Sequence, residues 1–255
     1  MSFYKYYPPE SVSFILTPLG ISLRFSQPST LNDPFELAPH ISDLTDAEKN
    51  EISKGVRNTF HLHTISTGEG KNNRSEQSLL KIENFVNELQ NDRKQRNFSS
   101  ILSEKYGVLS LCKDGFSRTM WSYYSNNHTG FLVEIDVNKL PIFSKANVDY
   151  IFDEVNYVTE RPKDLEDTKD NRRALFLSKD IAWKHEQEWR VVTELQNIKH
   201  INTIDNIPIH CDFLNAQNIK AVILGVNSSE ELRQKILTWK KHFAPNVEIK
   251  KSMVI

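Results

Sequence analysis

The segment KHEQEWR, residues 184–190, places two glutamates, Glu186 and Glu188, two positions apart, with one residue between them. Side chains two positions apart diverge around a helix, whereas on a strand they point to the same side, about 6.6 Å apart at twice the rise per residue. The WRVV sequence that begins at Trp189 is rich in strand formers, so a strand is favoured. We therefore expect Glu186 and Glu188 on one face of a strand, with Trp189 and Val191 pointing the other way into a core.

Two interpretations of this glutamate pair remain open. Like charges this close repel each other, and each favours a nearby cation or a shared proton, which is typical of a catalytic site. The alternative is a solvated strand edge on which Arg190 and Glu188 form a weak surface ion pair. These seven residues do not decide between the two, so other parts of the chain must.

A second stretch, WSYYSNNHTG, combines aromatic side chains with a histidine. If Ser117 caps a helix, Trp121, Tyr124 and His128 lie at i, i+3 and i+7 on one face, and Gly130 ends the helix in a left-handed turn. Trp121 is then expected in the core, while Tyr124 and His128 reach a pocket that suits a flat heteroaromatic ligand. The alternative is a packed aromatic face with a hydrogen-bonded histidine.

An early strand presents an arginine. In ISLRFS, residues 21–26, apolar and polar side chains alternate, and Arg24 lies between Ser22 and Ser26 on the polar face. A guanidinium can fork onto anionic oxygens, so Arg24 is the candidate phosphate-binding residue; otherwise it is an ordinary exposed arginine. The chain lacks a glycine-rich phosphate loop, an HExxH segment and a GxSxG elbow, so no metal is expected and a serine hydrolase is not indicated.

The elements that must position these residues follow from periodicity and turn signals. Strands are predicted at residues 107–112, 131–136, 149–158, 219–226 and 247–254, and helices at 45–61, about 79–96, 172–177 and 229–243. Because helices cluster early and strands late, the sequence predicts an α+β fold of two packed, bent β-sheets with helices at one end. One domain, 1–255, is expected, with a mainly helical insertion at about 40–105 after the first strand.

Composition limits the class of protein. The 255 residues carry a net charge of −1, which gives no general attraction to nucleic acid, and 38% are hydrophobic. Cys112 and Cys211 show no disulfide or zinc spacing, which is typical of a reducing compartment. No apolar run reaches membrane-spanning length. The sequence therefore predicts a soluble, cytoplasmic protein without a membrane partner.

Three blocks carry a resemblance to a family. LRFSQPSTLNDPFE, MWSYYSNNHTGFLVEID and WKHEQEWRVV resemble the hallmark blocks of a mainly bacterial family, domain of unknown function 2971. The opening FYKYY and the late VILG also match its pattern in the same order. The resemblance spans nearly the whole chain, with residues 40–105 the variable part, but the family name implies no activity.

A more distant resemblance does imply an activity. An arginine on an early strand, a serine on a middle strand and E-x-E entering a late strand resemble ADP-ribosyltransferases of the Arg–Ser–Glu type. This resemblance implies that Arg24 contacts the pyrophosphate of NAD, that Glu188 is the catalytic glutamate and that Glu186 acts on the acceptor. Ser110, in Leu-Ser-Leu, stands where Ser-Thr-Ser is typical of those enzymes.

The same resemblance would place Tyr124 and His128 against the nicotinamide ring. It implies NAD-dependent ADP-ribosyl transfer to an unknown protein or nucleic-acid acceptor, as a toxin or anti-phage effector with an antitoxin or operon partner. Two alternatives stay open. One is an NAD glycohydrolase or another hydrolase that uses two carboxylates, and the other is a non-catalytic nucleotide- or partner-binding module.

Overall fold

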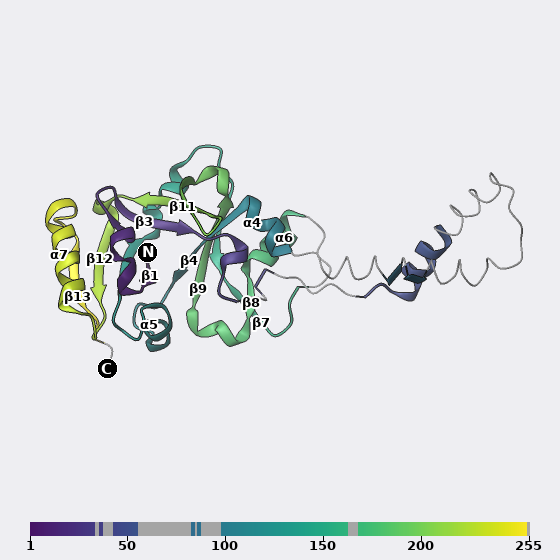
Figure 1. Cartoon of the computed structure of the whole chain (residues 1–255), viewed down its shortest axis with the longest axis horizontal. Coiled ribbons are helices and arrows are strands. Elements are labelled where there is room, and N and C mark those ends of the chain that lie inside the picture. Colours follow the sequence, from purple (N-terminus) through teal and green to yellow (C-terminus); the bar gives the residue numbers. More distant parts are fainter. Residues whose placement is uncertain are drawn as a thin grey trace, which may run out of the picture.

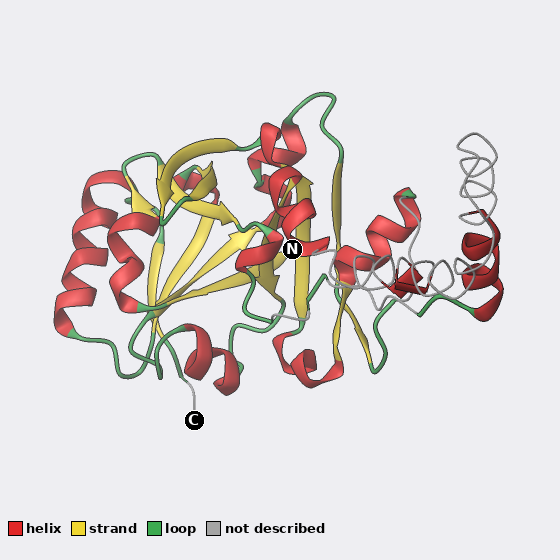
Figure 2. Ribbon diagram, turned by 45° about the vertical axis from the view of Figure 1, so that its right-hand side comes forward, coloured by secondary structure: helices red, strands yellow, loops and turns green. Residues whose placement is uncertain are grey.

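The computed structural model places strands in the middle of the molecule and helices around them (Figures 1 and 2). It describes residues 1–33, 36–37, 43–55, 83–84, 86–87, 98–162 and 168–253. Helix α7 (Glu230–Phe243) lies at one end, and α4 (Phe98–Lys105) and α6 (Lys169–Leu177) lie toward the other. The α+β prediction is confirmed, but the helices are not gathered at one end.

The largest sheet contains seven strands of the described chain, in the order β13-β12-β5-β1-β4-β9-β6. Its strands are β1 Ser2–Tyr7, β4 Tyr106–Cys112, β5 Phe131–Asp136, β6 Tyr150–Glu154, β9 Glu188–Glu194, β12 Ile219–Leu224 and β13 Glu248–Lys251. Neighbours are antiparallel except the parallel pair β12 and β13, so the sheet is mixed. The strands predicted at 107–112, 131–136, 219–226 and 247–254 are all part of it.

A second, four-stranded sheet packs beside the first in the order β10-β11-β3-β2. Its strands are β2 Leu16–Thr17, β3 Gly20–Phe25, β10 Lys199–Ile204 and β11 Ile207–Leu214. A single bridge between Ser26 and Val108 connects the end of β3 to β4. Two further strands, β7 (Asn156–Val158) and β8 (Ser178–Asp180), form a small parallel pair. The strand predicted at 149–158 is therefore two strands, β6 and β7, in different sheets.

The main core lies between the apolar sides of the two large sheets. Ile21, Leu23 and Phe25 of β3 and Leu109 of β4 are fully or almost fully buried, as their alternation predicts. Each such side chain contributes about 1.5–3 kcal/mol by leaving water. Ser22 is also buried, so β3 is covered on both sides and is not the half-exposed strand that its sequence indicates.

Helix α5 (Arg118–Tyr124) begins as predicted, because the hydroxyl of Ser117 accepts a hydrogen bond from the backbone N–H of Met120. It ends earlier than predicted. Asn126, Asn127 and His128 have φ of 48°, 51° and 66°, the left-handed region that asparagine tolerates best among residues with a Cβ. The left-handed turn therefore falls on these three residues, and the prediction that Gly130 forms it was wrong.

Gly130 is required for a different reason, because a Cβ at this position would lie 2.0 Å from the carbonyl oxygen of Tyr7. We expect Gly130→Ala to lower the free energy of unfolding by about 1–3 kcal/mol, the usual cost of overpacking. Gly55→Ala is the matched control, since nothing lies within 4 Å of its Cβ position. Urea unfolding of both variants tests this, and equal stabilities would contradict it.

The predicted helical insertion lies mostly outside the described residues. Within it, residues 46–55 are helical, and a capping box opens this helix as the TDAE sequence from Thr45 indicates: Thr45 N–H donates to Glu48 Oε2 at 2.7 Å, and Glu48 N–H donates to Thr45 Oγ1 at 3.2 Å. The helix predicted at 79–96 falls largely on residues that are not described, so it remains a prediction. Among the described helices, which also include the short α1 (Val12–Ile15), none is long and apolar enough to cross a membrane.

Candidate functional site

Four of the residues singled out in the sequence line one cleft of about 240 Å³: Ser110, Tyr124, Glu186 and Glu188. The antiparallel register of β4 and β9 pairs Cys112 with Glu188 and so brings the end of β4 beside the start of β9. Strand β1 and helix α5 supply other parts of the wall. The cleft therefore joins β1, the β4–α5 region and the start of β9, which are far apart in the sequence.

The two glutamates reach the cleft by an unpredicted backbone path. Glu186 ends the 3-10 helix η5 (Ile181–Glu186), Gln187 is left-handed with φ of 43°, and Glu188 starts β9. The prediction that both lie on one strand was therefore wrong. Both carboxylates nevertheless contact the same ammonium, with Lys179 Nζ 2.5 Å from Glu186 Oε2 and 3.1 Å from Glu188 Oε2.

The opposite side of β9 is apolar, as predicted. Val191 is fully buried in the core, and the Trp189 ring lies 5.3 Å from that of Phe3. Arg190 is fully buried on the glutamate side and donates from Nη1 to the carbonyl oxygen of Phe176 in α6 at 2.7 Å. The alternative of a solvated Arg190–Glu188 surface pair was wrong, because α6 covers this side of the strand.

Arg190 and Lys179 hold three carboxylates in a buried ionic network. The guanidinium of Arg190 forks onto Glu188, with Nε 2.9 Å from Oε1 and Nη2 3.0 Å from Oε2, and it also pairs with Glu36. Lys179 Nζ lies 3.8 Å from Glu36 Oε2. The side chains of these five residues, Glu36, Lys179, Glu186, Glu188 and Arg190, are 0–5% exposed. Their fixed orientation follows from these paired contacts.

Three carboxylates against two cations leave the ionic network with one negative charge when all are ionised. Burial raises the pKa of Glu188, and the ammonium of Lys179 opposes that rise. Burial would lower the pKa of Lys179, but Glu188 and Glu186 outweigh it and the pKa lies above its ordinary value. Burial lowers the pKa of Arg190 to about 9, which still leaves it charged at neutral pH. Both cations therefore remain available to the carboxylates.

Tyr124 connects α5 to the ionic network. Its hydroxyl donates to Glu186 Oε1 and accepts from Asn32 Nδ2 at 2.7 Å. Burial, and then the charge of Glu186, raise the pKa of Tyr124, so the side chain stays a neutral phenol that can donate. Glu186 is thus fixed on one oxygen by Tyr124 and on the other by Lys179.

We expect Tyr124→Phe to lower the free energy of unfolding by about 1–3 kcal/mol, because it removes a hydrogen bond to a buried charged group. Tyr123→Phe on the same helix is the control, since Tyr123 is 68% exposed and its change should stay within about 0.5 kcal/mol. Chemical denaturation of the two variants measures this difference. Equal effects would show that the Tyr124–Glu186 contact contributes nothing.

Arg24 and His128 do not line the cleft. The His128 ring stacks on Trp121 at 6.1 Å between centroids, and its carbonyl oxygen accepts from Asn227 N–H at 3.0 Å. The structure therefore favours the packing interpretation of His128, because the helix ends before this residue could share the Tyr124 face. The expected side-chain hydrogen bond is not found among the described residues, since the buried ring Nδ1 has no partner there. Trp121 is fully buried, as predicted. Arg24 lies on β3, and its charge helps to lower the pKa of Lys5.

Four further residues of the cleft and the ionic network were not predicted as site residues: Glu36, Lys179, Arg190 and Lys5. Arg190 could have been found, because the period of two that predicts a shared face for the glutamates also places Arg190 beside Glu188. Glu36 lies within one of the three dense blocks, but nothing local indicates its partner. Lys179 and Lys5 carry no sequence signal that distinguishes them from surface lysines.

Among the described residues, the cleft presents neither a cysteine thiolate at neutral pH nor a group of metal ligands. Cys112 lines it, and burial raises the pKa of this thiol to about 12, so it is not a thiolate nucleophile at neutral pH. In the part of the chain that the structure describes, no group of His, Cys, Asp and Glu is arranged to hold a metal ion. The polar groups that line the cleft include carboxylates, tyrosine hydroxyls and lysine amines.

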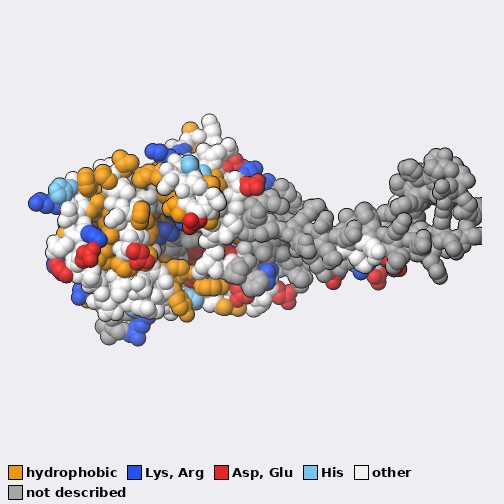
Figure 3. Space-filling model, viewed as in Figure 1, with side chains coloured by type: hydrophobic (Ala, Val, Ile, Leu, Met, Phe, Trp, Pro, Cys, Tyr) orange, Lys and Arg blue, Asp and Glu red, His pale blue; other side chains and the backbone are white. Residues whose placement is uncertain are grey.

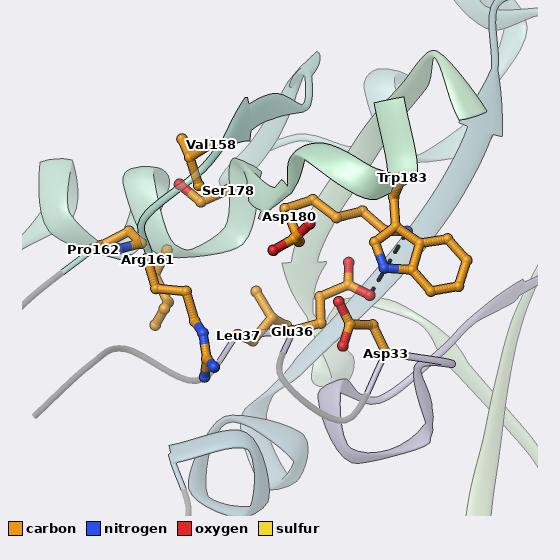
Figure 4. Close-up of a pocket in the computed structure, with 11 residues that line it drawn as sticks. Asp33, Glu36, Leu37, Val158, Arg161, Pro162, Ser178, Asp180 and Trp183 are labelled. Atoms are coloured by element: carbon orange, nitrogen blue, oxygen red, sulfur yellow. Dashed lines mark ion pairs between the residues drawn. The ribbon is translucent and has the colours of Figure 1, made fainter. Parts of the chain in front are cut away.

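A second cavity, of about 150 Å³, lies next to the cleft and shares Glu36 and Lys179 with it. Figure 4 shows Glu36 between Asp33 and Trp183, with its ion pair to Lys179 drawn as a dashed line. The Glu36–Lys179 pair therefore forms part of the wall of both cavities. On the face of the molecule that Figure 3 shows, basic, acidic and hydrophobic side chains of the described residues are interspersed.

This fold and cleft define an α+β protein with a buried carboxylate–cation network at a solvent-accessible pocket. The family described as "Protein of unknown function (DUF2971)" matches residues 120–191, a segment that runs from α5 through both cleft glutamates to Arg190. The match excludes Lys5, Arg24 and Ser110. Neither a curated protein nor a solved structure matches the chain.

Proposed function

We propose that the cleft cleaves the bond between nicotinamide and ribose in NAD and transfers ADP-ribose to an acceptor. The observation that carries this proposal is that Glu186 and Glu188 face one cleft and contact one ammonium, Lys179. Two carboxylates held at a polar cleft are the parts needed for glycosidic chemistry. The packing of the four-stranded sheet beside the seven-stranded sheet supports a relation to the split sheet of ADP-ribosyltransferases.

Glu188 is assigned to stabilising the transition state. As the bond breaks, nicotinamide takes the bonding electron pair and leaves as a neutral ring, while the ribose becomes oxocarbenium-like and positive. The ionic network carries one negative charge when its three carboxylates are ionised, and the fork of Arg190 fixes Glu188 beforehand. The positive charge on the ribose develops only in the transition state. A preorganised carboxylate that interacts with this charge therefore lowers the activation barrier without tightening substrate binding.

Glu186 is assigned to the acceptor. A base must take a proton from the nucleophile that attacks the ribose, and Glu186 lines the cleft next to Glu188. Tyr124 and Lys179 hold its two oxygens, which limits its motion. If water is the nucleophile, the same groups give an NAD glycohydrolase, so the acceptor decides between transfer and hydrolysis.

The test is incubation with NAD that carries a label in its adenylate half, with and without bacterial lysate. Release of nicotinamide with label in a macromolecule supports transfer to that acceptor. Release of nicotinamide with all label in free ADP-ribose supports hydrolysis. No release under either condition contradicts the proposal and leaves a non-catalytic binding module as the better account.

A further inference from the structure

Lys5 lies where two strands of the seven-stranded sheet separate. Strand β1 pairs with β5 over six residues but pairs with β4 only at Tyr4 and Cys112. Lys5 Nζ donates to the carbonyl oxygen of Ser110 in β4 at 2.9 Å, and Lys5 lines the cleft. One of the three donor positions of the ammonium is therefore used by the protein, and the side chain reaches the space that a ligand would occupy.

This ammonium has no counterion among the described residues. Lys179, in the same cleft, contacts three carboxylates, whereas Lys5 forms no ion pair in the described part of the chain. Burial lowers the pKa of Lys5 to about 8; Glu188 opposes this shift and Arg24 adds to it. A partly buried cation that makes no ion pair is costly unless something else neutralises it.

A second cation without a counterion lies close by. Arg24 on β3 forms no ion pair with any described residue, and its buried Nε has no hydrogen-bond partner. Its charge is near enough to lower the pKa of Lys5. Two neighbouring cations from different sheets repel each other, so an anion bound at this point would remove that repulsion and complete the hydrogen bonding of Lys5.

We infer that Lys5 binds a phosphoryl group of the ligand that enters the cleft. The ligand's identity as NAD rests on the proposed function, but the anion site itself does not. A nicotinamide nucleotide is positive at its ring and negative at its pyrophosphate. That polarity matches a cleft that is lined both by the carboxylates of Glu186 and Glu188 and by the ammonium of Lys5. The hydroxyl of Ser26 lines the same cleft as a further donor.

Inorganic pyrophosphate is the probe, because it carries the anion without the rest of a nucleotide. Its affinity is measured by calorimetry for the unmodified protein, for Lys5→Met and for the control Lys139→Met, which removes an exposed lysine of the 3-10 helix η3 (Val137–Lys139). Lys5→Met is expected to weaken binding roughly tenfold to a hundredfold, the scale of one charge-assisted hydrogen bond. Lys139→Met is expected to leave it unchanged. Lys5→Met should fold, since it removes an ammonium that burial disfavours.

The pH dependence of pyrophosphate binding by the unmodified protein gives a second measurement, which does not rely on a folded variant. Lys5 loses its proton as pH rises through about 8, so pyrophosphate affinity should fall between pH 7 and 9.5, although the charge of the probe itself only grows. Other groups that face the cleft are Tyr4, Tyr6, Cys112, Tyr124, Glu36, Lys179, Glu186 and Glu188. The tyrosine and cysteine pKa values are raised by burial, and that of Lys179 is raised by its carboxylate partners. The same pH series on Lys5→Met isolates the contribution of Lys5.

Each result decides the inference separately from the proposed function. Lys5-dependent binding that weakens above pH 8 supports the anion site, even if NAD is never cleaved. No binding at millimolar pyrophosphate, or binding that Lys5→Met leaves intact, overturns the anion site, even if NAD is cleaved.

Discussion

Arg190→Met is expected to lower the free energy of unfolding by about 3–5 kcal/mol, the cost of removing one partner from a buried ion pair. Methionine has a similar reach but no charge, so Glu36 and Glu188 would both depend on Lys179, which already contacts Glu186. Both carboxylates would then remain buried without enough cations. A loss of this size exceeds half of the stability of many domains, so the variant is expected to be poorly folded near 37 °C.

Arg173→Met is the matched control for this prediction. Arg173 lies on α6, near the backbone that Arg190 contacts, but its ion pair with Asp153 is exposed. Such a pair contributes about 0–1 kcal/mol. Thermal and urea unfolding of both variants measure the difference. If Arg190→Met were as stable as Arg173→Met, the ionic network would have no structural role.

Glu188→Gln is expected to reduce nicotinamide release by roughly 10² or more, the scale of losing one preorganised electrostatic contact. The variant should fold, because two carboxylates, Glu36 and Glu186, would then face two cations, Lys179 and Arg190. We expect a stability loss of about 1–3 kcal/mol from the weakened hydrogen bonds, larger than an exposed strand glutamate would give. Steady-state release of nicotinamide, recorded beside the melting temperature, separates the two effects.

Glu186→Gln makes the same change of charge two residues earlier in the chain and serves as the comparison. Because Glu186 is assigned to the acceptor, label transfer should fall more than nicotinamide release does. Glu188→Gln should lower both equally. If the two variants behaved alike in both assays, the separate assignments of Glu186 and Glu188 would be wrong.

Much of the fold could be predicted because its signals are local. The Ser117 and Ser229 caps and the alternation in β3 each depend on a few neighbouring residues, and the structure contains them. The hairpin of β10 and β11 was missed for a physical reason. All six residues of β10 are exposed, so the strand shows no buried face, and its place beside β11 is fixed by backbone pairing.

The candidate site could be predicted only in part because its contacts are not local. Glu186 and Glu188 were found as a pair from spacing, yet their common partner Lys179 lies in a different strand, β8, and shows no pattern. Glu36 joins them from more than a hundred positions away in the chain. Helical spacing continued past Tyr124 predicts His128 on the Tyr124 face. In the structure the helix ends at Tyr124, and Asn126 and Asn127 have left-handed backbone angles. Tertiary packing decided each of these positions.

The most direct test of the central claim is the initial rate of nicotinamide release from NAD by the unmodified protein and by folded Glu188→Gln, each with its melting curve. The account predicts measurable release by the unmodified protein and a rate lower by roughly 10² or more for Glu188→Gln at temperatures where both are folded. Undiminished release by a folded Glu188→Gln protein would contradict it.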